Sequence, residues 1–411
     1  VRVGLVSPSW PASQASNGIV TYTDVMAKAL AREGAHVTVI AQNLTEPGSA
    51  GDSVYAAEGE QTLVARVGDF MRYRVMRRRW PDPRKMAANV AKAVRSLPIE
   101  HSVDVVEVEE AFGYARHLAQ LIPQPVIVRL HGPHFLGAFG ALDADDGARM
   151  AVEGAAIRDA IAVTSPSPGL LAATVKQYGR AGQVNAVIPN PVEMHSSRWR
   201  LSNCDRNTIL FVGRFDLRKG GDVIIEAFTH LAASRPQLRL VMVGPDTGVA
   251  RADGSGVDRF ESFVAAHVDA AVAARIEFRG RVPLGEVAKL RQTALVAVGA
   301  SRFENFSYAQ FESLAFGAPT VLTRTFGPSE ILQDGEGGLF VPPGDAEALA
   351  KAIAALIDDP DKAADLGERG PGAVARVCGP ANVARSTLKF YASVLAEEAF
   401  QPIERNAATV G

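Results

Sequence analysis

Residues 294–322 read ALVAVGASRFENFSYAQFESLAFGAPTVL. The apolar run that ends near Ser301 is typical of a buried strand, and the residues from about Ser307 onward have the spacing of a helix. A second apolar run, PTVL, follows that helix. A strand, a helix and another strand in this order indicate parallel strands joined by a crossover helix.

The same alternation extends over both halves of the chain. The run VRVGLVS opens the first half and NTILFVGRF opens the second, and residues 191–206 (PVEMHSSRWRLSNCDR) between them have no regular periodicity. A chain of 411 residues is also longer than one hydrophobic core usually grows. We therefore predict an α/β fold of two doubly wound, Rossmann-like domains, 1–195 and 206–380, with a cleft between them and a helix and tail over 381–411.

The composition disfavours several classes of protein. The formal net charge is -2, which leaves no basic excess for a nucleic-acid binder. Cys204 and Cys378 suggest neither a disulfide framework nor a cysteine zinc site, and a reducing cytosol fits them best. The N-terminal VRVGLVSP reads as a strand rather than a signal peptide, and no apolar run reaches the roughly 20 residues of a membrane-spanning helix. We expect a cytoplasmic protein.

Common α/β signatures and metal motifs are weak in this sequence. No G-x-G-x-x-G follows a strand and no P-loop occurs, which disfavours oxidoreductases and ATPases. His131 and His134 have no third ligand nearby in the sequence, so both are interpreted as loop histidines. The D-x-D-D run from Asp143 to Asp146 follows no strand, and we interpret it as a solvated acidic loop rather than a cation site. We expect no metal.

Two glutamates flank the helix of the opening stretch. Glu304 follows the strand, and Glu312 falls in the early turns of the helix. In open α/β sheets ligands bind at the carboxyl ends of strands, where Glu304 is expected. The backbone amides around Phe306, Ser307 and Tyr308 would form a helix N-terminus suited to a diphosphate. The alternative is a pair of surface glutamates.

A second cluster lies in ILFVGRFDLRKGGDVIIEAF, residues 209–228. A strand is expected to end at Gly213, and Arg214 and Lys219 fall in the turn before the next helix. Both cations suit the oxygens of a nucleotide diphosphate, and the glycines of this turn permit close backbone approach. A solvated cationic turn is the alternative.

These motifs together resemble the GT-B fold retaining glycosyltransferases of glycosyltransferase family 4. The resemblance rests on the G-R-x4-K-G turn, on the E-x7-E pair with AFGAPTV after it, and on GPSEILQDGEGGLFVPPGD. In the first half, SNGIVTYTDVMAKALAREGAHVTVI is similar to the glycine loop and first helix of the family, and RLHG to its strand-end histidine. By this resemblance the helix near 381–399 crosses back onto the first domain.

The resemblance also implies a role for each candidate residue. Arg214 and Lys219 would hold the donor diphosphate. Glu312 would bond the ribose hydroxyls, while Glu304 would meet the donor sugar and His131 would lie beside it. The donor-binding set is completed by Gly18, Gly213, Asn305, Phe306 and Ser307. The chain departs from the family at Asn17 and at Ser307, where many members have glycine; Asn tolerates unusual backbone angles, so we expect the first loop to persist.

The function implied by the resemblance is transfer of a sugar from a nucleotide-diphosphate sugar to an acceptor hydroxyl, with retention of configuration and without metal or cofactor. We favour a UDP-sugar as donor. The alternatives are a catalytically silent sugar-nucleotide-binding protein, and an epimerase or phosphorylase on the same fold.

A basic and aromatic cluster occupies the first half between Phe70 and Lys85. It contains Arg72, Arg74, Arg77, Arg78, Arg79, Arg84 and Lys85 around Tyr73 and Trp80. Such a cluster can rest on an anionic membrane surface or attract a phosphate-bearing acceptor. Because Pro81 and Pro83 interrupt any long amphipathic helix, a solvated loop and helix start is the alternative.

Overall fold

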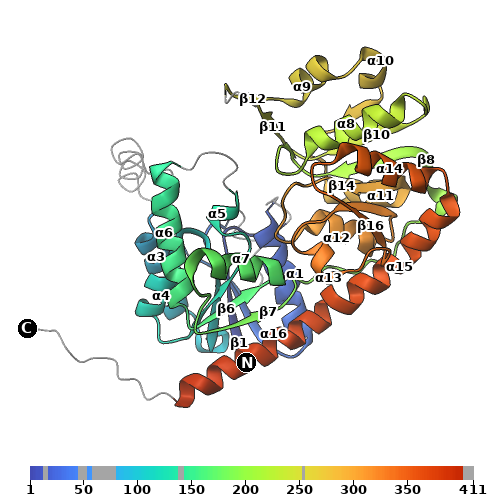
Figure 1. Ribbon diagram of the computed structural model, residues 1–411. Helices are drawn as coiled ribbons and strands as arrows, with labels where there is room; N and C mark the ends of the chain where they lie inside the picture. Colours follow the sequence, from blue (N-terminus) through green and yellow to red (C-terminus); the bar gives the residue numbers. More distant parts are fainter. Residues whose placement is uncertain (13–16, 45–52, 58–79, 138–142, 252–254, 401–411) are drawn as a thin grey trace, which may run out of the picture. The chain divides into compact units, whose positions relative to one another are not determined.

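The structure is a computed structural model that describes residues 1–411 except 13–16, 45–52, 58–79, 138–142, 252–254 and 401–411 (Figure 1). The chain divides into two compact units. Unit 1 comprises 1–165, 171–188 and 381–411, and unit 2 comprises 166–170 and 189–380.

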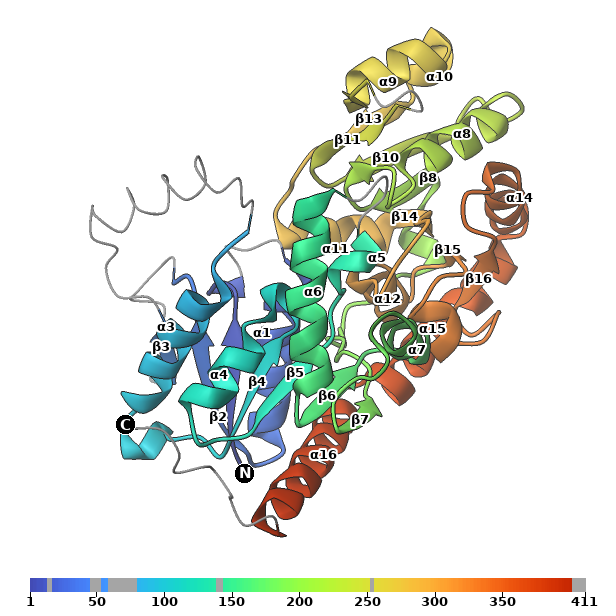
Figure 2. The ribbon, with the colours of Figure 1, turned by 60° about the vertical axis from the view of Figure 1, so that its left-hand side comes forward.

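Unit 1 is built on a parallel sheet of seven strands in the order β3-β2-β1-β4-β5-β6-β7. Its helices α3, α4 and α6 lie side by side (Figures 1 and 2). The strands are β1 (Arg2–Ser7), β2 (His36–Ala41), β3 (Val54–Ala56), β4 (Val105–Glu109), β5 (Val126–Arg129), β6 (Ala162–Ser165) and β7 (Val184–Val187). The helices are α1 (Gly18–Arg32), α3 (Pro83–Arg95), α4 (Ala115–Leu121), α5 (His134–Gly137), α6 (Ala144–Asp159), α7 (Pro168–Tyr178) and α16 (Pro380–Phe400).

Unit 2 has a parallel sheet of six strands in the order β13-β10-β8-β14-β15-β16 and a small sheet β12-β11-β9. The strands are β8 (Asp205–Val212), β9 (Phe215–Asp216), β10 (Arg239–Val243), β11 (Asp246–Ala250), β12 (Val257–Asp258), β13 (Ile276–Phe278), β14 (Ala294–Gly299), β15 (Thr320–Thr323) and β16 (Gly338–Val341). The helices are α8 (Gly221–Ala232), α9 (Phe260–His267), α10 (Ala270–Ala273), α11 (Leu284–Thr293), α12 (Tyr308–Ala315), α13 (Pro328–Ile331), α14 (Ala346–Ile357) and α15 (Pro360–Cys378).

Both large sheets reverse their strand order beside the first strand of the unit. In unit 1, β1 lies between β2 and β4, and in unit 2, β8 lies between β10 and β14. Such a reversal is where open α/β sheets bind ligands at the carboxyl ends of their strands. The predicted fold class, two doubly wound parallel sheets, is confirmed, and the reversal in unit 2 joins the two stretches that carry the candidate residues.

The stretch 191–206, which lacks periodicity in the sequence, packs within unit 2 rather than forming a free connection. Trp199 is 7% exposed, and its indole nitrogen donates to the carbonyl of Ala294 at 2.7 Å. At the other end of the chain, α16 packs within unit 1, where the phenol of Tyr391 donates to the carboxylate of Glu107 at 2.6 Å.

The acidic run at Asp143 starts a helix, so its interpretation as a solvated loop is wrong. Asp143 caps α6: its side chain accepts from the amide of Asp146, whose carboxylate accepts from the amide of Asp143 in return. Asp145 accepts from the indole nitrogen of Trp80 at 3.0 Å. The physical reason is that a helix leaves its first amides unpaired, and aspartates at the cap and third positions satisfy them.

The basic cluster falls mostly outside the described residues, because 58–79 are not among them. Within the described part, Trp80 is buried and Arg84 is exposed at the start of α3. A membrane-spanning helix would need greater length and apolarity than any helix of the described residues has.

Candidate functional site

A strand-to-helix turn after β8 places the cationic candidates. The carboxylate of Asp216 accepts from the backbone amide of Lys219 at 2.6 Å and pairs with the Nε of Arg214 at 2.8 Å. Gly220 has φ 70°, and a Cβ there would lie 2.0 Å from the carbonyl oxygen of Ala300, just past the end of β14. Only glycine fits this position, because the backbone is left-handed and the space for a side chain is filled.

The close approach at Gly220 brings Lys219 to Glu304. The ammonium of Lys219 lies 2.5 Å from Oε1 of Glu304, and the hydroxyl of Ser301 donates to the same oxygen at 2.6 Å. The guanidinium of Arg218 lies 3.8 Å from Oε2. Glu304 is 2% exposed, so this is a buried carboxylate with one close and one more distant cation.

The surroundings of Glu304 keep it ionised. Burial by itself would raise the pKa of this carboxyl, but the charges of Lys219 and Arg218 and the hydrogen bonds from Lys219 and Ser301 hold it below the usual value. Coulomb attraction is strong where water is excluded, and here it outweighs the cost of desolvation. The site therefore holds a weakly basic carboxylate beside two cations.

The helix α12 starts where the sequence predicts. Ser307 is its N-cap residue and makes no side-chain capping bond, so its hydroxyl does not satisfy the first amides of the helix. The ring of Phe306 stacks on Phe311 with centroids 4.3 Å apart. The ring is therefore engaged in packing, and the predicted donor contact of Phe306 would be made by its backbone amide. Asn305 is 7% exposed, and within the part of the chain that is described its Oδ1 atom is buried without a hydrogen-bond partner.

Glu312 has a partner that the sequence did not indicate. Its carboxylate lies 2.6 Å from a guanidinium nitrogen of Arg291 on α11, and the side chain of Arg291 is 6% exposed whereas that of Glu312 is 28% exposed. The buried arginine fixes the carboxylate from one side and leaves its other side open to solvent. An ionised acceptor of this kind suits the vicinal hydroxyls of a sugar.

The candidates of unit 1 lie at strand ends and at a helix start. Asn17 caps α1 through its side chain, which accepts from the amide of Ile19, and Gly18 is the first residue of that helix. His131 follows β5, and the ring of Tyr22 meets its ring edge-on at 4.9 Å. Burial, and then the charge of Arg129, hold the pKa of His131 well below the usual value. His131 is therefore a neutral imidazole at physiological pH.

Sequence reasoning missed the residues that hold the site together. Asp216 and Ser301 were not singled out, nor was Arg302, whose guanidinium forks onto Asp222 at 2.6 and 2.7 Å and so ties the Glu304 loop to the start of α8. An aspartate three residues before Lys219 is a turn signal that the sequence offers. The contacts between residues on neighbouring strands can be predicted only when the strand order is known.

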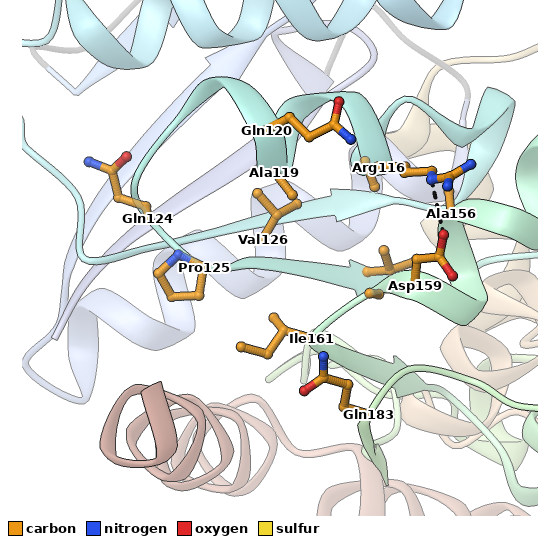
Figure 3. A pocket seen from close by; sticks show the side chains of 13 residues that line it. Arg116, Ala119, Gln120, Gln124, Pro125, Val126, Ala156, Asp159, Ile161 and Gln183 are labelled. Carbon is orange, nitrogen blue, oxygen red and sulfur yellow. Dashed lines mark ion pairs between the residues drawn. The ribbon is translucent and has the colours of Figure 1, made fainter. Parts of the chain in front are cut away.

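A cavity of about 320 Å³ lies elsewhere, in unit 1 between α4 and α6, at the amino end of β5 (Figure 3). The ion pair between Arg116 and Asp159 is part of its lining, at 2.9 Å. Pro125, Val126 and Ile161 form an apolar part of the wall. The candidate residues named above do not line this cavity, and it lies at the strand ends opposite to those that carry His131.

Two protein families match the chain. Residues 196–372 match Glycosyl transferases group 1, and residues 17–191 match the Glycosyl transferase 4-like domain. The chain is 31% identical over 233 residues to the D-inositol 3-phosphate glycosyltransferase of Acidothermus cellulolyticus, which is 56% of this chain and 50% of that protein. It is 32% identical over 166 residues to the lipopolysaccharide core biosynthesis glycosyltransferase LpsE of Rhizobium meliloti, 40% of this chain and 44% of the relative. These matches span about half the length of the curated relatives.

Solved glycosyltransferase structures share the fold over nearly the whole chain. Sucrose-phosphate synthase from Thermosynechococcus elongatus has a TM-score of 0.73 and 23% identity, covering 96% of this chain and 99% of that one. Anabaena HepE in complex with UDP and glucose has a TM-score of 0.67 and 15% identity, covering 95% of this chain and 99% of that one. At these identities the similarity establishes the fold, which confirms the GT-B architecture.

Proposed function

Since this chain belongs to the GT-B glycosyltransferases of family 4, we propose that it transfers a sugar from a nucleotide-diphosphate sugar to an acceptor hydroxyl with retention of configuration and without a metal. The observation that carries the proposal is the ion pair between the half-buried Lys219 and the buried Glu304 at the reversal of strand order in unit 2. Such a reversal is a ligand site in doubly wound sheets. Because HepE binds UDP and UDP-glucose, we favour a UDP-sugar as donor.

The chemistry asks the protein to stabilise two opposite charges. Breaking the bond between the anomeric carbon and the diphosphate leaves negative charge on the phosphate and positive charge on the sugar. Arg214, Lys219 and the amides that begin α12 would stabilise the phosphate. Fixed cations do this without a divalent ion, which supports metal independence.

The charge state of Glu304 supports retention. A carboxylate whose pKa is held below the usual value by Lys219 and Arg218 is a poor proton acceptor. We therefore assign Glu304 to binding and orienting the donor sugar rather than to general base catalysis. A phosphate oxygen of the leaving group then takes the proton of the acceptor hydroxyl, which attacks from the leaving-group face, so the configuration is kept.

Nucleotide recognition can be measured through Glu312. A ligand that binds only the folded state raises the melting temperature. Since we favour a UDP-sugar as donor, we expect UDP to raise the melting temperature of the wild type in excess EDTA more than GDP or ADP does. Glu312→Gln should lower this UDP shift, since the amide keeps one oxygen but loses the charge that binds ribose hydroxyls. Glutamine rather than alanine is chosen because Arg291 is buried and needs an acceptor. An unchanged UDP dissociation constant in this variant would rule out the ribose role.

Recruitment of an anionic acceptor or membrane surface by Arg72–Lys85 is a second, separate proposal. It rests on the basic and aromatic composition of that segment and on the exposed Arg84. Neutralising Arg77, Arg78 and Arg79 should reduce sedimentation with anionic vesicles at low salt, or raise the acceptor KM, because surface attraction is screened beyond about one Debye length. If neither quantity changes, the segment has no part in recruitment.

A further inference from the structure

Two buried carboxyl groups hold the backbone of the HGPH segment, residues 131–134. The amide of His131 donates to Oε2 of Glu110 at 2.9 Å, and the amide of Gly132 donates to Oε1 of the same residue at 2.6 Å. The amide of His134 donates to Oε1 of Glu153 at 2.7 Å. Glu110, which follows β4, is 2% exposed and Glu153, on α6, is 1% exposed.

The hydrogen bonds divide the charge between the two acids. Both oxygens of Glu110 accept from backbone donors, which suits a carboxylate. At Glu153, the amide of His134 and the phenol of Tyr178, at 3.4 Å, both donate to Oε1, so Oε2 is the oxygen that can carry a proton. Burial raises the pKa of Glu110 as well, but its two backbone hydrogen bonds and the charge of Arg129 oppose that rise, whereas the charge of Glu110 raises the pKa of Glu153 further. Two like charges in one buried place repel strongly, so the pair keeps a single negative charge, on Glu110.

The other charged groups around Glu153 do not cancel this effect. Burial, and then the charge of Glu110, raise the pKa of Glu153 to about 8, against smaller opposing contributions from the His134 amide, Arg149 and Tyr178. His134 itself is occupied by Asp146, 2.8 Å from its Nε2. Arg149 lies over the ring of Phe112, with 4.4 Å from its Cζ to the ring centroid. Glu153 is therefore neutral at pH 7 and charged above about pH 8.

We propose that Glu153 is a positioning residue for His131, and that the HGPH segment keeps its active shape only while Glu153 is neutral and Glu110 alone carries the charge. Above about pH 8 a second buried anion would push Glu153 away from the His134 amide or draw water into the HGPH segment. His131 would then move with that segment. The proposal rests on the proposed function, because it assumes that His131 faces the transferring sugar.

The test compares the pH dependence of turnover in full-length wild type and Glu153→Gln. The probe is whichever of UDP-glucose, UDP-galactose and UDP-N-acetylglucosamine the wild type hydrolyses fastest. Glutamine matches the neutral acid, with an oxygen to accept and an NH₂ in place of the hydroxyl. Wild-type kcat should fall about tenfold from pH 7 to pH 9, as expected for a single group of pKa near 8, while the fall is absent in Glu153→Gln. The affinity for UDP should not change with pH, because Glu153 and the diphosphate site lie in different units.

Glu109→Gln is the matched control. Glu109 is another buried carboxyl of unit 1, whose pKa burial raises to about 7, but its partners are Tyr114 and Gln42 rather than the HGPH segment. This variant should keep the fall in kcat near pH 8. If Glu153→Gln shows the same fall with the same midpoint as the wild type, the positioning role is wrong while the glycosyltransferase function stands.

A measurement without substrate separates the two proposals further. The folded protein binds the Glu153 proton more tightly than the unfolded chain, whose glutamate has a pKa of about 4.3. Stability contributed by the neutral acid is therefore lost as the pH rises from about 5 through 8. The melting temperature of the wild type should fall relative to Glu153→Gln over this window. Equal pH dependence in both proteins would overturn the charge assignment. A wild type that consumes no nucleotide sugar would overturn the proposed function, and with it the role of His131, but would leave the charge assignment of Glu153 and Glu110 standing.

Discussion

Replacing Lys219 with alanine should lower kcat by about 10²–10³, the usual loss when a fixed charge that stabilises a transition state is removed. The ammonium of Lys219 lies 2.5 Å from Glu304 and is held by a turn that Asp216 and Gly220 shape. In the proposed mechanism, its removal takes a cation from the leaving phosphate. Among the described residues it also leaves Glu304 with Arg218, at 3.8 Å, as its remaining cation, and removing one partner of a buried ion pair costs about 3–5 kcal/mol of stability.

Two variants separate the catalytic loss from the loss of stability. Lys219→Met combined with Glu304→Gln removes both charges and should restore much of the melting temperature but not turnover. Lys351→Ala is the matched control, because this lysine of unit 2 pairs with Glu347 at the surface, with 74% of its side chain exposed. It should change neither quantity measurably. Near-wild-type turnover in folded Lys219→Ala would show that the ammonium does not act on the leaving group.

Glu304→Ala should lower kcat by a similar factor of about 10²–10³, because it removes a fixed negative charge beside the positive charge that grows on the sugar. This carboxylate contacts Lys219 through one oxygen and lies 3.8 Å from Arg218 with the other, and Ser301 holds it in place. Without it the two cations lose the anion between their charges, and in the proposed mechanism the donor sugar loses an ionised partner. We expect kcat to fall much more than the affinity for UDP, because the diphosphate contacts remain.

Glu304→Gln and Glu347→Ala complete this experiment. Glutamine keeps the shape and the hydrogen bond from Ser301 but not the charge, so it should be nearly as inactive as alanine. Glu347 is exposed and paired with Lys351, and its removal should be silent. If Glu304→Ala and Lys219→Ala both turn over like the wild type, the assignment of the site to this strand reversal is wrong.

Much of the fold can be read from the sequence because the information is local. The β-branched runs that end near Gly213 and Ser301 predict strands, and Ser307 marks the start of α12 as the N-cap residue in the structure. The acidic run at Asp143 was misread, since D-x-x-D is also a local helix-start signal.

The pairings inside the site could not be read in this way. Lys219 and Glu304 are 85 residues apart in the chain and meet because β8 and β14 are neighbours in the sheet. Arg291 and Glu312 also come from separate elements, the helices α11 and α12, so their contact could not be predicted from local periodicity either. Periodicity places a residue on a strand end or a helix face, but the strand order decides which long side chains meet, and burial then decides their charge.

The most direct test follows the anomeric carbon of the donor by ¹H NMR. Full-length wild type in excess EDTA is incubated with UDP-glucose, UDP-galactose or UDP-N-acetylglucosamine, and the sugar released first is observed before it mutarotates. Our account predicts that one donor is consumed, that UDP accumulates, and that the first sugar formed has the anomeric configuration of the donor. It is contradicted if the first sugar has the opposite configuration, or if the wild type consumes donor no faster than Lys219→Ala.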